Sequence, residues 1–496
     1  MFKTSFKKLS FIFSLRLFLG SLLLIIFLVF LFLKVVPFGK ITYYRDYSDK
    51  LRSGKGFIYG FTPSERIFIS KSGEPRIIGD PVYFSLFTPR TFDKAKVTVE
   101  YKDNLSAETP IIEAGVLSDK IVWNYDLKPL QNKIIDSLRL NWAEISSGDV
   151  SLLQKDNNYN DFQAFKNDLE KGSLKNCPEG PRNCLAFYNY SFDLDNSLNA
   201  KNEINSSLPL ELDIPLRGAH QFFLYLNSEE LSLDFSFSDL NQDKDLDPIT
   251  VNIYYGNKLL DTLFLADNNL ASSAKVIENR SLSFKKSNLK PGFYKVELKV
   301  SDDIVIKKIK SSVNKISFIN KVWPVSNSGG VVLYSDANYL QVKAYSPASL
   351  QSLESGGLQL VIDEAYRQFY FNLPGENKIK EIKIKKDDLI LENNGVFSWS
   401  PNSLINPGFT KVDRFFKPSE NIKYIVSRYD TPQIKDNFKF ASAEFNLRGV
   451  YREKGKYSFM ISIPGLRAEE NINNYLEIKS IKIELSGRTL WQKIFN

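Results

Sequence analysis

The chain has 496 residues, of which 43% are hydrophobic and 14% aromatic. A chain of this length supports several domains with their own cores, and so many aromatic residues exclude a disordered protein. The formal charge is +8, but five of these charges lie within the first 34 residues, which leaves +3 for the rest. So small an excess gives no sign of the concentrated basic surface of a nucleic-acid-binding protein, and we predict no nucleic-acid partner.

Residues 17–36 are the most apolar stretch of the chain, and Lys34 is the one charged residue in it. As a helix this stretch is about 30 Å long, which matches the hydrocarbon core of a bilayer. Lysine and arginine precede it without any acidic residue, so the positive-inside rule predicts a cytoplasmic tail at residues 1–16. We therefore predict a single-pass anchor in the cell membrane at residues 17–36, followed by an extracytoplasmic region.

Two alternatives to an uncleaved anchor stay open. A cleaved secretory signal has a shorter apolar run that ends in small residues, whereas this run is longer and leads into Val35, Val36, Pro37 and Phe38. A buried helix of a soluble protein is the second alternative, because apolar side chains surround the helix on every face.

Strand-like sequence follows the anchor. We expect residues 37–79 to form a membrane-proximal stalk. Residues 95–101 alternate between apolar and polar side chains, which is typical of a half-buried strand. Residues 111–116 and 121–127 are separated by a polar turn and are expected to pair as a hairpin.

One short helix interrupts these strands. Phe162, Phe165 and Leu169 lie at helical spacing, Asp161 or its neighbour Asn160 can cap the start, and Gly172 can close the end. The helix is too short to be stable alone and must pack on the sheet. We predict that residues 80–200 form a β-sandwich domain that includes this helix.

The only two cysteines, Cys177 and Cys184, enclose Pro178, Gly180 and Pro181. These residues favour a reversal that brings the two sulfur atoms together, and such a pair is expected to oxidise outside the cytoplasm. We predict a disulfide that stabilises the fold by about 2 kcal/mol. Free thiols and a zinc site are the alternatives, although further zinc ligands are scarce in a chain with one histidine.

A second sandwich of the jelly-roll type is predicted for residues 201–326. Residues 231–238 alternate strictly between apolar and polar side chains, as one sheet of a sandwich requires. Residues 327–496 are predicted to form the C-terminal sandwich domain or domains. Residues 369–375 and 459–465 are alike there, which indicates either a duplicated unit or merely the similarity of any two sandwich strands. The predicted class is thus mainly β: a single transmembrane helix followed by tandem β-sandwich (jelly-roll or Ig-like) domains.

One loop of the second sandwich is rich in acidic residues. Oxygen-bearing side chains, the donors that Ca²⁺ prefers, occupy every second position; these residues are Asp239, Asn241, Asp243, Asp245 and Asp247. The match to a calcium loop is incomplete, because Lys244 replaces the turn glycine and Thr250 replaces the closing glutamate. The alternatives are a calcium site that stiffens the domain and a solvated acidic connection; no other cofactor is predicted.

Catalysis by a histidine-based triad would need His220, the only imidazole, which lies beside a predicted strand and is expected to be structural. No nucleophile-elbow motif occurs, so no catalytic residue is predicted and we expect a protein that is not an enzyme. Sugar binding would instead need exposed aromatic rings, and large aromatics are more often packed in the core. The candidate platforms are the five tryptophans, Trp123, Trp142, Trp323, Trp399 and Trp491.

Four segments give the outer region a resemblance to exported, membrane-anchored β-sandwich proteins of ultrasmall candidate-phyla bacteria; they read PLRGAHQFFLYL, SFSDLNQDKDLDP, LKPGFYKVELKVSDDIVIKKI and LYSDANYLQVKAYSPASLQ. The resemblance covers most of residues 80–490 and implies a surface location. Because those proteins are uncharacterised, it implies no site residue.

These observations predict a membrane-anchored binding or adhesion protein of the cell envelope, with a glycan or an envelope protein as its partner. A scaffold subunit of an envelope assembly is the first alternative, and an uncovered apolar sheet edge would favour it. A surface carbohydrate-active hydrolase is the second, and a cleft with two converging carboxylates would favour that function.

Overall fold

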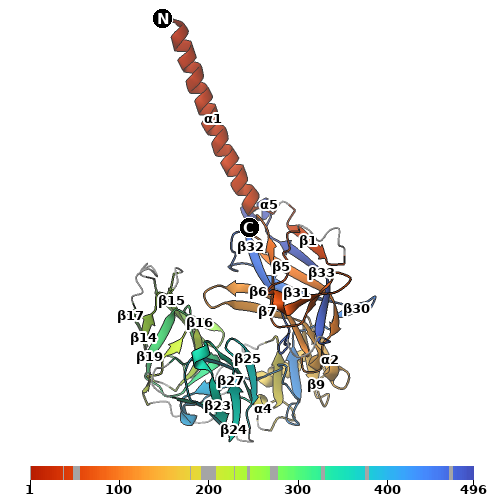
Figure 1. Cartoon of the computed structure of the whole chain (residues 1–496), viewed down its shortest axis with the longest axis vertical. Coiled ribbons are helices and arrows are strands. Elements are labelled where there is room, and N and C mark those ends of the chain that lie inside the picture. Colours follow the sequence, from red (N-terminus) through yellow and green to blue (C-terminus); the bar gives the residue numbers. More distant parts are fainter. Residues whose placement is uncertain are drawn as a thin grey trace. The chain divides into compact units, whose positions relative to one another are not determined.

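The computed structural model describes residues 2–36, 38–48, 56–178, 180–190, 208–227, 229–242, 246–267, 277–325, 330–374, 379–468 and 473–495. It contains two compact units (Figure 1): unit 1 comprises Met1–Asn141 and Tyr429–Asn496, and unit 2 comprises Trp142–Arg428. Strands dominate both units, which confirms the predicted mainly β class with an N-terminal apolar helix.

The N-terminal helix α1 extends over Phe2–Lys34. Its segment Phe13–Leu33 has a mean hydropathy of 2.7 and is not buried against any described part of the protein. The helix has no polar face that would favour water, so its length and composition suit the interior of a bilayer.

Unit 1 is a sandwich of two sheets around an apolar core. One sheet has the strand order β2-β3-β33-β5-β31-β30, with β1 also paired to β33, and the other has the order β4-β32-β6-β7. The predicted hairpin is confirmed as β6 and β7. The elements are η1 (Ser64–Arg66), α2 (Lys133–Arg139), α5 (Leu490–Phe495), β1 (Lys40–Asp46), β2 (Ile67–Ile69), β3 (Pro75–Ile77), β4 (Val82–Phe87), β5 (Lys94–Asn104), β6 (Ile111–Asp119), β7 (Asn124–Asn132), β30 (Gln433–Lys435), β31 (Phe438–Asn446), β32 (Lys456–Ser462) and β33 (Tyr475–Ser486).

The predicted stalk at residues 37–79 is wrong, because these residues are part of the sandwich. Strand β1 is antiparallel to β33 over its whole length, from Lys40 opposite Ser486 to Asp46 opposite Ser480. Strands β2 and β3 extend the same sheet. Within this segment Tyr47 is buried in the core and Tyr43 packs against it, whereas Tyr44 is exposed.

Unit 2 begins and ends in a small sheet of order β28-β10-β29-β9-β8. Helix α3 (Phe162–Glu170) packs on this sheet through Phe165 and Leu169, and the Asp161 side chain caps its start by accepting a hydrogen bond from the Ala164 N–H. The predicted short helix is thus confirmed. The other elements are α4 (Pro181–Cys184), β8 (Ala143–Ser147), β9 (Val150–Gln154), β10 (Leu185–Tyr188), β28 (Thr410–Lys411) and β29 (Tyr424–Ser427).

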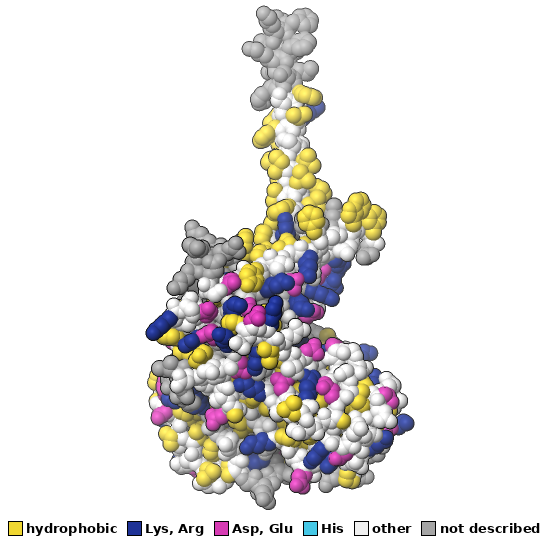
Figure 2. Space-filling model, turned by 90° about the vertical axis from the view of Figure 1, so that its right-hand side faces the viewer, with side chains coloured by type: hydrophobic (Ala, Val, Ile, Leu, Met, Phe, Trp, Pro, Cys, Tyr) yellow, Lys and Arg dark blue, Asp and Glu magenta, His cyan; other side chains and the backbone are white. Residues whose placement is uncertain are grey.

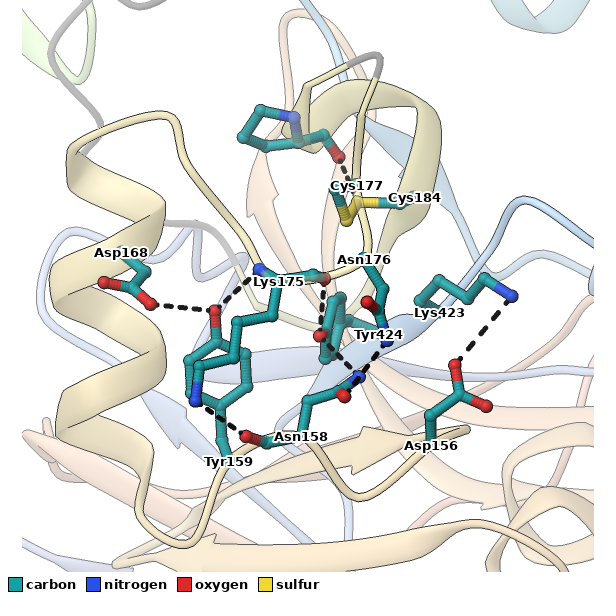
Figure 3. The surroundings of a disulfide bond; sticks show 11 residues. Asp156, Asn158, Tyr159, Asp168, Lys175, Asn176, Cys177, Cys184, Lys423 and Tyr424 are labelled. Atoms are coloured by element: carbon teal, nitrogen blue, oxygen red, sulfur yellow. Dashed lines mark hydrogen bonds and ion pairs between the residues drawn. A yellow bond between two sulfur atoms is a disulfide. The ribbon is translucent and has the colours of Figure 1, made fainter.

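Cys177 and Cys184, the last residue of α4, form the predicted disulfide (Figure 3). Tyrosine hydroxyls hold the chain that leads to it. The Tyr159 hydroxyl donates to Asp168 and accepts from the Lys175 N–H, and the Tyr424 hydroxyl donates to the Lys175 carbonyl oxygen. The disulfide loop is therefore fastened to both α3 and β29.

The middle of unit 2 consists of two large sheets that share one core. One sheet has the order β11-β19-β14-β17, with β12 paired to β19. The other has the order β16-β15-β18-β13-β20-β27-β21-β26-β23-β24, with β22 paired to β25 and β27. Strand β14 (Leu231–Asp239) shows the predicted alternation, since Leu231, Leu233, Phe235 and Phe237 are all buried between the sheets.

The remaining elements of unit 2 are η4 (Pro347–Ser349), η5 (Pro401–Ser403), β11 (Leu210–Leu212), β12 (Leu216–Arg217), β13 (His220–Leu226), β15 (Ile249–Tyr255), β16 (Lys258–Leu265), β17 (Glu278–Lys286), β18 (Gly292–Lys299), β19 (Ile304–Ser311), β20 (Ile316–Val322), β21 (Val331–Ser335), β22 (Tyr339–Ala344), β23 (Gln351–Ser355), β24 (Leu358–Ile362), β25 (Gln368–Asn372), β26 (Lys380–Ile384) and β27 (Leu389–Ser398).

The predicted domain boundaries therefore need correction. Residues 80–200 are divided, because those up to Asn141 belong to unit 1 and those from Trp142 to unit 2. Residues 201–326 and the first part of 327–496 share one extended sheet, through the pairing of β20 with β27. The last part of 327–496 returns to unit 1, where β33 pairs with β5. The physical reason is that the partners of β5 and β9 lie far along the chain, so unit 2 is inserted into unit 1.

Candidate binding groove

A groove with a volume of about 470 Å³ lies in unit 2 where β11 passes the end of β27. Its apolar wall consists of Leu210, Leu212, Ile214, Ile316 and Val332. Strand β11 reaches this position because it pairs with the edge of β19, with Glu211 opposite Lys310. The volume falls within the ~300–1,000 Å³ that is common for small-molecule sites.

Trp399, directly after β27, gives the groove an aromatic side. Its ring packs edge-on against Phe318, with centroids 4.9 Å apart and an interplanar angle of 76°. The Trp399 Nε1 atom is buried and has no hydrogen-bond partner among the described residues. The ring is part of the lining of the groove, and its packing against Phe318 fixes its orientation.

Hydroxyl groups lie on the same side of the groove as Trp399. Ser398, Ser400 and Ser403 line it. The Ser400 hydroxyl accepts a hydrogen bond from the Asn402 N–H and so caps η5, while the Ser398 hydroxyl donates to the Ile316 carbonyl oxygen at 3.3 Å. These contacts hold the polar side chains in place on regular elements rather than on a long loop.

Two carboxylates, Glu211 and Asp213, complete the lining. The Lys308 ammonium lies 2.7 Å from a Glu211 carboxylate oxygen and 3.6 Å from an Asp213 oxygen, and Lys310 lies 3.4 Å from Glu211. The hydrogen bond from Lys308 holds the pKa of Glu211 below its usual value. Glu211 is therefore ionised at neutral pH and suits hydrogen-bond acceptance rather than general-acid catalysis.

A second groove, with a volume of about 340 Å³, lies next to the first and shares Leu210 and Glu211 with it. Its lining is more polar than that of the first groove and includes Ser232, Asp234 and Lys310. The two grooves adjoin at Leu210 and Glu211, so a ligand longer than one ring can contact both.

Three of the five predicted calcium ligands are buried in the structure and do not form an open acidic loop. Asp239 is buried, and its carboxylate lies 3.0 Å from the Arg280 guanidinium. Asn241 and Asp247 are also buried; the Asn241 N–H donates to Asp239, and the Asp247 carbonyl oxygen accepts from Arg280.

Asp243 and Asp245 lie outside the described residues. Within the described ranges, no group of three or more histidine, cysteine or acidic side chains is placed to hold a metal ion. Calcium binding and a solvated acidic connection therefore both stay open for this loop.

The five tryptophans differ in their surroundings. Trp323 is buried, and its Nε1–H donates to Asp388 at 2.9 Å, so it is part of the core. Trp142 is partly exposed, Trp399 lines the groove, and Trp123 and Trp491 are exposed.

His220 is buried and lies between the Gly218 carbonyl oxygen and the Trp323 N–H. Both of its ring nitrogens are engaged in holding the backbone, which is a structural arrangement. Sequence reasoning named Trp399 but missed Glu211 and Asp213 as its neighbours, because these residues are far apart along the chain.

No protein-family model and no curated protein matches the sequence. Among solved structures, the chain has 8% identity and a TM-score of 0.17 to a structure titled as the triple jelly roll fold and turret assembly in an archaeal virus, covering 73% of this chain and 96% of that chain. The VP2 subviral particle of infectious bursal disease virus gives 9% identity and a TM-score of 0.15, with coverages of 91% and 78%. The tandem CBM22 domains of Paenibacillus barcinonensis Xyn10C give 9% identity and a TM-score of 0.12, with coverages of 53% and 82%. Scores this low carry no argument about function.

Proposed function

We propose that the chain is a membrane-anchored, extracytoplasmic binding protein of the cell envelope that holds glycans in the groove beside Trp399. Helix α1 supports the anchor, because Phe13–Leu33 is long and apolar enough to cross a bilayer and is not buried in the described protein. The basic residues before this segment orient the N-terminus toward the cytoplasm by the positive-inside rule.

The observation that carries the binding role is the combination of surfaces in the groove. A sugar ring has apolar C–H faces and a rim of hydroxyl groups. The apolar wall and Trp399 can contact the faces, while Glu211, Asp213 and the partly exposed Ser400 can exchange hydrogen bonds with the hydroxyls. The side chains are already fixed by packing and hydrogen bonds, which limits the entropy cost of binding.

A glycan array probed with the full-length protein in lipid nanodiscs tests this function. We expect specific binding that Trp399→Ala lowers by about tenfold or more, while Trp123→Ala, which removes an exposed tryptophan elsewhere, leaves it unchanged. Because Trp399 also packs on Phe318, the exposed change Glu211→Gln provides a second variant that does not threaten the core. Binding that is equal in all four proteins, or absent from wild type, would contradict the assignment.

A scaffold role is the second candidate, and one observation favours it. Strand β24 is the last strand in the order of the extended sheet, and Leu358 and Val361 on it are 53% and 62% exposed. An apolar edge strand with free backbone groups can pair with another chain. Size-exclusion chromatography with light scattering tests this role. If β24 holds an assembly together, Val361→Lys should dissociate it and lower the measured molar mass to that of one chain.

A further inference from the structure

The short C-terminal helix α5 exposes two aromatic rings. Trp491 and Phe495 are 69% and 72% exposed, and their rings are stacked with centroids 5.4 Å apart and an interplanar angle of 10°. The helix has a defined start, because the Thr489 N–H donates to the Gln492 side chain and the Thr489 hydroxyl accepts from the Gln492 N–H. This reciprocal capping box fixes the direction in which the helix leaves β33.

Backbone hydrogen bonds place the start of α5 beside the end of α1. The Gly39 N–H donates to the Val36 carbonyl oxygen just after α1, and the Gly487 N–H donates to the Gly39 carbonyl oxygen at 3.0 Å. Trp491 is four residues beyond Gly487, so its backbone lies within ~14 Å of this point at the greatest possible extension. Figure 1 shows α5 next to the lower end of α1, and Figure 2 shows hydrophobic side chains gathered there.

Basic side chains surround the same place. The Arg90 guanidinium lies over the Phe32 ring of α1 at 4.1 Å and donates to the Phe32 carbonyl oxygen. Arg448 and Arg488 both approach Asp93, at 3.4 and 3.6 Å, and retain about half of their side-chain surface exposed, 58% and 45%. Two arginines beside Asp93, together with Arg90 at the end of α1, bring more positive than negative charge to this place, which suits the phosphates of lipid headgroups.

We propose that α5 is a second membrane contact, in which Trp491 and Phe495 lie in the headgroup region of the same bilayer that α1 spans. Aromatic residues favour the boundary between headgroups and hydrocarbon, and arginine at that depth pairs with phosphate. Two contacts on adjoining elements would stop unit 1 from swivelling about the end of α1. The proposal rests on the anchoring role of α1 and adds an orientation to it.

Quenching of tryptophan fluorescence in the full-length protein, reconstituted into phosphatidylcholine liposomes, tests the proposal. The Trp491 emission is isolated as the difference between wild type and Trp491→Phe. Trp123→Phe provides the matched control, because Trp123 is 66% exposed but lies at the β6–β7 turn. We expect lipids brominated near the headgroup to quench Trp491 about twofold or more over Trp123, and aqueous iodide to quench it correspondingly less.

Flotation of the liposomes after an alkaline wash separates this proposal from the anchor itself. Protein that fails to float refutes the anchor, and the second contact with it. Protein that floats while Trp491 is quenched by iodide as strongly as Trp123, and is unaffected by brominated lipid, refutes the second contact alone.

Discussion

Acid should weaken unit 2 through His220, whose imidazole is only 2% exposed. Its Nδ1–H donates to the Gly218 carbonyl oxygen at 2.8 Å, and its Nε2 accepts from the Trp323 N–H at 3.1 Å. Protonation would place a hydrogen on Nε2 opposite another donor. Burial, and then the Lys321 ammonium, lowers the pKa of His220 from 6.5 to about 3.

The direction of the effect follows from these values. Between pH 6.5 and about 3, the unfolded chain binds a proton at His220 and the folded chain does not. The free energy of unfolding therefore falls as the pH falls through this window. A pH of about 5 is ~1.5 units below the pKa of the imidazole in the unfolded chain. The free energy of unfolding is therefore about 2 kcal/mol lower there than at neutral pH.

Urea denaturation of the full-length protein in detergent, followed by tryptophan fluorescence at about pH 7.5 and pH 5, measures this loss. The variant His220→Gln keeps an acceptor for the Trp323 N–H but does not titrate. Contributions from all other groups cancel in the difference between the two proteins. We expect wild type to lose about 2 kcal/mol more than the variant on acidification. Parallel losses would refute the assignment of a buried, neutral imidazole.

Further predictions concern buried charges, the disulfide and calcium. Arg280→Met should lower the free energy of unfolding, measured by urea denaturation, by about 3–5 kcal/mol, because it leaves the buried Asp239 carboxylate without its partner. A decrease below ~1 kcal/mol would show that water reaches the pair. Burial, and then the nearby Asp80, raises the pKa of Glu113 to about 7, so the free energy of unfolding should fall as the pH rises from 4.5 to 7. The variant Glu113→Gln should remove this fall, which amounts to up to about 3 kcal/mol. A variant with the pH profile of the wild type would contradict the prediction. Replacing both Cys177 and Cys184 by serine should lower the free energy of unfolding by about 2 kcal/mol, whereas no loss would mean that the reduced loop is equally constrained. Chelation of calcium should leave the melting temperature unchanged, since Arg280 already neutralises Asp239; a fall on chelation, reversed by Ca²⁺ alone, would instead establish the calcium site.

Local features were predictable because their physical causes lie within a few residues. Alternation over residues 231–238 predicted the buried face of β14, and the spacing of Phe165 and Leu169 predicted the buried face of α3. The short separation of Cys177 and Cys184 predicted their disulfide. In each case the pattern itself shows which side chains leave water.

Strand partners were not predictable in the same way. The alternation in β5 shows that one face is buried, but it does not show that β33, more than 350 residues later, lies beside it. The domain boundaries failed for this reason. The groove was equally hidden, because Glu211 and Trp399 meet only after β11 pairs with β19 and β20 pairs with β27. The resemblance to bacterial surface proteins stays a prediction.

Hydrogen exchange of the full-length protein in nanodiscs, with and without the glycan that the array selects, tests the binding role most directly. The groove assignment predicts slower exchange in two separate segments, residues 210–214 and 398–403, with little change in unit 1. Trp399→Ala should abolish both effects together. Protection confined to other segments, or the absence of any selected glycan, would contradict the assignment.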